Sequence, residues 1–176
     1  MKNIMKRVLS GLALAAVVAQ APSLRAEDSF SLERFSPSLP GDRFFGVEGG
    51  DPGGHPLPRV MLLGDYAYRP LSVYDANDDK IADLTTNHLV LHVAAGISLF
   101  DRLLLAADMP LTLVMTGKDD PVTGYSSGKG ASAGDLRLSV RGRLVGEAKS
   151  IASLSLGAHV WVPTGDTGKF TGTGSV

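Results

Sequence analysis

The feature that most constrains the fold is an alternation of apolar and polar side chains, with a period of two, that recurs in five segments. Successive side chains of a β-strand point to opposite faces, so this period predicts strands with one apolar face. The clearest case is 135–145, where leucine and valine alternate with serine and arginine. The segments expected as strands are 59–69, 87–99, 102–115, 135–145 and 151–163.

The connections between these segments alternate between long and short. The long ones are 70–86, 116–133 and 164–174, and the short ones are 100–101 and 146–150. Outer-membrane β-barrels have short periplasmic turns and longer external loops, joined by strands of about ten residues with alternating hydrophobicity. The sequence therefore predicts an all-β fold, an antiparallel transmembrane β-barrel with about five to six strands present and without those that would close it.

The cost of placing charge in lipid assigns the two faces of the predicted strands. In 135–145, a slip by one residue would turn three arginines toward lipid, at about 2–4 kcal/mol for each one near the midplane. We therefore expect them inside the barrel, paired with Asp65, Asp108 or Asp135; the same alternation puts Trp161 inside rather than in an aromatic girdle. The interior-facing polar candidates are Asp65, Arg69, His88, His92, Asp108, Arg137, Arg141, Arg143 and His159.

The N-terminal region has the form of an export signal followed by an irregular stretch. Lysines and an arginine precede an uncharged apolar run over 8–21, and a small residue, Ala26, stands before an acidic pair. This pattern predicts a signal peptide over 1–26. Residues 27–58 are too rich in proline and glycine for regular structure and read as a tail or linker, ahead of a barrel portion over 59–176. The expected location is the bacterial outer membrane.

Composition excludes several function classes. The net charge is −1 and the pI about 6.4, which gives no reason to expect nucleic acid as a partner. The chain has no cysteine, which removes disulfides, thiolate metal sites and cysteine nucleophiles. We expect no cofactor and no enzymatic activity, and membrane lipid as the principal partner.

Two weaker patterns compete with that expectation. His88, His92 and His159 would serve a serine hydrolase with Ser139 or Ser155 as nucleophile, but ordinary interior polar residues are the preferred interpretation. A calcium site is the weak alternative for four oxygen-bearing side chains at near-alternate positions, although the glycine and closing glutamate of an EF-hand are missing. These four residues are Asp75, Asn77, Asp79 and Asp83.

Several segments resemble known outer-membrane proteins. The stretch Phe30–Phe45, FSLERFSPSLPGDRFF, resembles the start of mature OmpA-family proteins of the myxobacterial type. The stretches 103–111, Gly134-Asp135-Leu136-Arg137-Leu138 and Pro163-Thr164-Gly165-Asp166 are similar to strands of barrels grouped with the MetA pathway of phenol degradation. In OmpA relatives a periplasmic peptidoglycan-binding domain often follows the barrel. This chain contains no such domain, so peptidoglycan is implied as a partner only through a further domain.

These observations lead to a ranked expectation of function. The first is an OmpA-type outer-membrane barrel with a structural or envelope-anchoring role. The second is an outer-membrane pore or transporter for small solutes, hydrophobic ones among them. The third is a soluble exported binding barrel, which would carry its apolar face inward.

Overall fold

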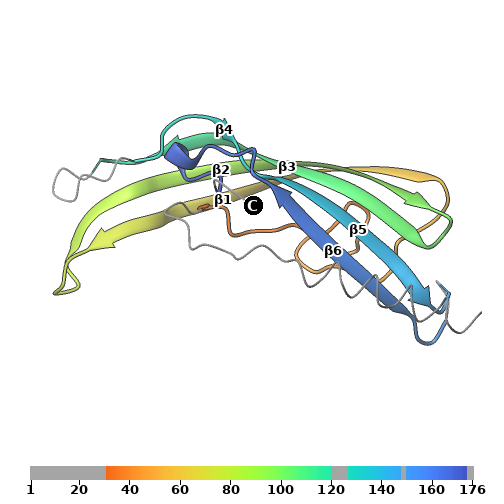
Figure 1. The fold of residues 1–176 in the computed structure, drawn as a ribbon. Helices are drawn as coiled ribbons and strands as arrows, with labels where there is room; N and C mark the ends of the chain where they lie inside the picture. The colour runs from red at the N-terminus through yellow and green to blue at the C-terminus, as the bar shows by residue number, and fades with distance from the viewer. Residues whose placement is uncertain (1–30, 120–126, 148–149, 174–176) are drawn as a thin grey trace, which may run out of the picture.

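The computed structural model describes residues 31–119, 127–147 and 150–173. The predicted signal peptide over 1–26 lies outside these residues. The described chain is all-β and forms one antiparallel sheet, curled into a half-barrel (Figure 1). Its elements are β1 (Leu57–Tyr74), β2 (Lys80–Leu99), β3 (Leu103–Thr116), β4 (Ser132–Ala133), β5 (Leu136–Val145), β6 (Leu154–Val162) and the 3-10 turn η1 (Thr167–Lys169).

The sheet follows the order of the chain. The strands lie side by side as β1-β2-β3-β5-β6, and the short β4 pairs with the far end of β3. All neighbours are antiparallel, as expected for strands joined in sequence by hairpins and loops. β1 and β6 are therefore the two edges of the described sheet.

The predicted strands are present, but the predicted bounds of the first loop were wrong. Residues 70–86 were expected as a long acidic loop, whereas β1 runs to Tyr74, β2 begins at Lys80, and only 75–79 connect them. The pairing of β1 with β2 continues through register shifts after Tyr68, close to Pro70. A proline and polar side chains are tolerated there because β1 is an edge strand that needs no hydrogen bonds on its outer side.

The turn between β2 and β3 agrees with the short connection expected at 100–101. Phe100 and Asp101 both have positive φ, at 56° and 55°, and Arg102 N–H donates to Leu99 O at 3.1 Å. Two successive left-handed residues make a type I′ turn, whose twist matches that of the flanking strands. The turn fixes the register of β2 and β3.

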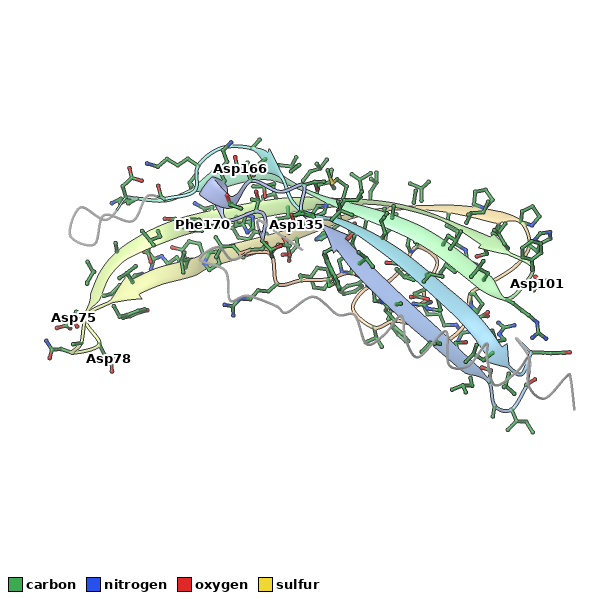
Figure 2. All side chains as sticks on the ribbon, in the orientation of Figure 1. Asp75, Asp78, Asp101, Asp135, Asp166 and Phe170 are labelled. Atoms are coloured by element: carbon green, nitrogen blue, oxygen red, sulfur yellow. The ribbon has the colours of Figure 1, made fainter. Side chains whose placement is uncertain are left out.

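The two faces of the sheet differ sharply in chemistry. On β5, Leu138 and Val140 are 43% and 40% exposed, whereas Arg137 and Arg141 are 3% and 2% exposed. The exposed apolar side chains stand on the convex face and the polar ones on the concave face (Figure 2). Large apolar residues of the convex face, between 37% and 66% exposed, are Leu62, Tyr66, Val93, Leu105, Leu138, Val140, Leu156 and Val160.

Residues 31–54, predicted to be part of a tail or linker, instead pack against the concave face of the sheet (Figure 1). We call them the inner segment. Leu39 is 1% exposed and forms a small apolar cluster with Leu104 and Ala106 of β3. The segment has no regular secondary structure beyond a bridge between Phe44 and Val47, which is why its dense prolines and glycines gave no sign of a packed position.

The segment after β6 folds back onto the start of β5. Asp135 accepts hydrogen bonds from Gly165 N and from Thr173 N, each at 2.9 Å. Thr164 Oγ1 accepts from Leu136 N and donates to Gly134 O, again at 2.9 Å. These contacts bring two of the motifs noted in the sequence together at one end of the sheet. Among the described residues, no helix is long and apolar enough to span a membrane.

Candidate functional site

The concave face carries a row of three buried arginines on β5, which we call the arginine ladder: Arg137, Arg141 and Arg143. They share a face because an even number of positions separates them on a strand. Their side chains are only 3–5% exposed, so each guanidinium needs partners to offset the loss of water. The inner segment supplies most of these partners.

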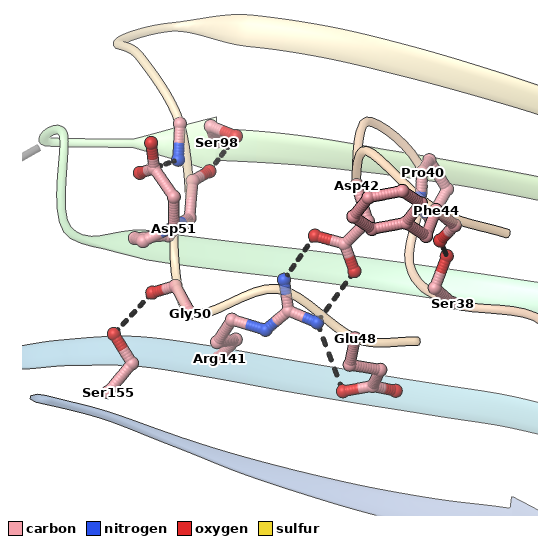
Figure 3. Close-up of polar contacts among 12 residues, drawn as sticks. Ser38, Pro40, Asp42, Phe44, Glu48, Gly50, Asp51, Ser98, Arg141 and Ser155 are labelled. Atoms are coloured by element: carbon pink, nitrogen blue, oxygen red, sulfur yellow. Dashed lines mark hydrogen bonds and ion pairs between the residues drawn. The ribbon is translucent and has the colours of Figure 1, made fainter. Parts of the chain in front are cut away.

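Arg141 stands at the centre of the site (Figure 3). Its two terminal nitrogens donate to the two carboxylate oxygens of Asp42 at 2.7 and 2.9 Å, a bidentate geometry. Glu48 accepts a further bond from Arg141 at 3.0 Å. The Asp42 and Arg141 side chains are each 3% exposed, so this ion pair is shielded from solvent.

The other two arginines bind the two ends of the inner segment. Arg137 donates to Ser36 Oγ at 2.5 Å and to Pro37 O at 2.6 Å, and it pairs with Asp108 of β3 at 3.3 Å. Arg143 pairs with Asp51 and donates to the backbone oxygen of Asp101 at 3.2 Å.

The predicted partners of the arginines were therefore only partly right. Asp108 does pair with the ladder, through Arg137. Asp135 is bound by Gly165 and Thr173 of the chain after β6 instead. The acids that hold Arg141 and Arg143 come from the inner segment and were not foreseen.

A second polar group surrounds His92 of β2. Its Nδ1 lies 3.3 Å from Asp108 Oδ2, and its Nε2 lies 4.0 Å from Glu33 Oε1 of the inner segment. Burial raises the pKa of Glu33, partly offset by the charge of His92 and by a hydrogen bond from Phe35 N, while Asp65 and Asp108 raise it further. His88, the next histidine on the same face, lies 3.2 Å from Thr112 Oγ1.

The residues considered for a hydrolase come together only in part. Ser139 Oγ lies 2.9 Å from Nδ1 of His159, whose Nε2 lies 3.2 Å from Glu48. This contact joins directly paired residues of β5 and β6, and Ser139 is 7% exposed, which leaves a substrate little room to reach its hydroxyl. Ser155 donates to Gly50 O instead. The arrangement works as a polar link between the sheet and the inner segment.

A cavity of about 290 Å³ lies between the inner segment and the sheet. Glu33 and Phe35 line one side, and Asp108, Arg137 and the inward-facing Trp161 line the other. Within the described residues, the buried atoms without a hydrogen-bond partner include four from residues that line this cavity: Glu33 Oε2, His92 Nε2, Asp108 Oδ1 and Arg137 Nε. The contact between segment and sheet is thus less complete here than at Arg141.

The remaining sequence candidates lie away from this site. Arg69, with a φ of 50°, lies over the Tyr68 ring at 4.9 Å and pairs with Asp83 at 3.4 Å, with almost half of its side chain exposed. Asp83 also pairs with Lys80. The described residues contain no cluster of three or more histidine, cysteine or acidic residues that could hold a metal ion.

The proposed calcium ligands belong to a hairpin. The Asp75 carboxylate accepts hydrogen bonds from the backbone N–H groups of Asp79 and Asn77, each at 2.8 Å. These bonds lower the pKa of Asp75, the bond from Asp79 most. Because Asp75 holds the turn and Asp83 faces Lys80, two of the four candidates already have partners within the chain.

Sequence reasoning missed the acids of the inner segment: Glu33, Asp42, Glu48 and Asp51. One signal could have found them. Three arginines on one strand face need more buried negative charge than the neighbouring strands carry, and the nearest supply in the sequence is the stretch 33–51.

The chain was compared with protein-family models, with curated proteins and with solved structures, and none of the three searches found a match. The function is therefore argued from the geometry alone.

Proposed function

We propose that this chain is part of a β-barrel protein of the bacterial outer membrane, with its convex face against lipid. One observation carries the proposal: large apolar side chains such as Leu138 and Val160 are exposed on the convex face, while Asp108 and the three arginines of β5 are buried on the concave face, beside apolar residues such as Leu104. A soluble sheet protein packs its apolar face inside, because burying it stabilises the fold by about 25 cal/mol per Å². Lipid is the environment in which the observed arrangement is stable.

The same distribution argues against the soluble binding barrel. Such a barrel would expose arginines and aspartates and bury leucines and valines. Here Leu156 is 66% exposed while Arg141 is 2% exposed. In water, a contiguous apolar surface of this kind would drive association.

Within the membrane proposal, a structural role in the envelope is the first candidate. The inner segment lies against the concave face and is held there by ion pairs from Asp42, Glu48 and Asp51 to the arginine ladder, which favours a filled barrel over an open pore. The second candidate is a pore or transporter for small solutes. The cavity beside His92 favours it, because polar groups line it on both sides.

Reconstitution tests the membrane assignment. The intact protein is refolded in detergent, mixed with phospholipid and dialysed to form vesicles. It should then float with the vesicles and resist extraction by urea. Release by urea would show that the protein only adheres to the surface and would refute the assignment. Conductance across planar bilayers then separates the two roles: a structural barrel gives small or no currents, and a pore gives steady ones.

A further inference from the structure

We infer that the inner segment is a detachable plug, docked on the arginine ladder, that closes the interior of the barrel. The inference rests on the proposed membrane barrel and adds a conformational device to it.

The contacts that hold the inner segment are made mainly by side chains. Its links to the ladder and to Ser155 join residues 92 to 105 positions apart. Ser98 of β2 adds a bond to Pro52 O at 2.5 Å. Within the described residues, the segment's one long-range backbone–backbone bond, from Leu32 N to Phe170 O, goes to the turn after β6 and not to a strand. The segment can therefore leave without breaking the backbone hydrogen bonds between the strands of the sheet.

The apolar contacts that oppose that departure come from small or single side chains: Leu32 and Leu39 are 7% and 1% exposed, and Pro37, Pro40 and Pro52 are each less than 2% exposed. Leu39 is the buried anchor, packed against Leu104 and Ala106. Phe44, Phe45 and Val47, by contrast, are 66–68% exposed. A buried ion pair depends strongly on both partners being present, so the loss of one partner is the change most able to shift docking against these apolar contacts.

Arg141 is the residue on which docking depends most. It binds Asp42 and Glu48, and the side chains of Asp42 and Arg141 are both almost fully buried. Removing one partner leaves the other as a buried, unpaired charge. We expect Arg141→Gln to shift the docking equilibrium toward release by about 100-fold or more.

A crosslink makes the test specific. Gly50 lies beside Ser155, and a Cβ at Gly50 would lie 3.9 Å from Ser155 Oγ, with no other atom within 4 Å apart from its own chain neighbours. Because the chain has no cysteine, Gly50→Cys with Ser155→Cys should form one disulfide that locks the segment in place. The double-cysteine protein is made with and without Arg141→Gln and inserted in planar bilayers.

We expect the conductance to depend both on the substitution of Arg141 and on whether the cysteine pair is oxidised. The Arg141→Gln protein should conduct when reduced and close when oxidised, while the protein with native Arg141 stays closed in both states. Asp42→Asn, which alters only the segment, is the second variant and should also raise conductance. Arg69→Gln, at an exposed pair, is the matched control and should change nothing.

Two results would overturn the plug. In one, Arg141→Gln and Asp42→Asn insert normally but conduct no more than the native protein. In the other, the conductance of Arg141→Gln is the same before and after oxidation, so that the segment does not block the path. Failure of the membrane proposal is a different outcome, because the protein would then not float with vesicles at all.

Discussion

At the scale of single residues, the site is governed by the cost of burying charge. Arg141 is removed from water and is stabilised by Asp42 and Glu48 together. Arg69 also forms an ion pair, with Asp83, but 48% of its side chain is exposed. The Arg141–Asp42 pair is shorter, at 2.7 Å against 3.4 Å, and is also shielded from solvent, so the contributions of the two pairs to stability should differ greatly.

We therefore predict that Arg141→Gln lowers the free energy of unfolding by about 3–5 kcal/mol, because it leaves the buried Asp42 carboxylate unpaired. Arg69→Gln should cost about 0.2–1 kcal/mol, as is usual for exposed ion pairs. Urea unfolding of both variants in detergent micelles measures the difference. Equal losses would mean that Arg141 is hydrated in solution.

Glu33 gives a pH dependence of defined sign. The pKa of Glu33 is raised in the folded chain, chiefly by burial. At pH values just above the ordinary carboxyl pKa, folding is therefore accompanied by uptake of a proton. Stability from this group is fully present below the unfolded pKa and is lost as pH rises through the raised value. Glu33→Gln should therefore stabilise the protein at neutral pH, with a gain that shrinks as pH falls toward 4.5. A gain in stability that stays constant between about pH 4 and about pH 8 would refute this account of Glu33.

At the scale of elements, alternation predicted much of the sheet. The segment expected as 135–145 is observed as β5, Leu136–Val145, and that expected as 102–115 is observed as β3, Leu103–Thr116. The extensions of β1 over 70–74 and of β2 over 80–86 could not be predicted, because Pro70 and the Lys, Asp and Thr side chains of 80–86 also suit a loop. Their pairing is set by the partner strand, which local sequence does not show.

The hairpin between β1 and β2 offers a test of turn chemistry. Asp75 N donates to Asp79 O and closes a three-residue loop over 76–78 within the connection. Asp78 has a φ of 64° and its N–H donates to Asp75 O, which makes it the left-handed residue of this loop. Asp78→Gly should raise the free energy of unfolding by about 0.5–1 kcal/mol, since glycine adopts this conformation without strain. Ala76→Gly is the control and should lower stability by about the same amount. A loss in both variants would show that the side chain of Asp78 matters more than its backbone.

At the scale of the whole molecule, the placement of the inner segment could not be read from the sequence. Its contacts reach across about a hundred residues, as between Asp42 and Arg141, and it has no periodicity to reveal which side is buried. In contrast, the common face of the arginines followed from the alternation of 135–145, and the expected cost of placing them in lipid assigned that face to the interior. Local rules thus predicted the sheet, and the packing of the irregular segment required the structure.

The central claim is that the convex face of the half-barrel contacts lipid, and a spin label tests it most directly. Because the chain has no cysteine, Leu138→Cys on the convex face and Asp78→Cys at the hairpin tip each give one labelled position. In vesicles, the label at Leu138 should collide strongly with oxygen, which concentrates in lipid, and weakly with a water-soluble nickel complex. The label at Asp78 should do the reverse. A label at Leu138 that is shielded from both reagents, or that meets the nickel complex more often than oxygen, would contradict the membrane assignment.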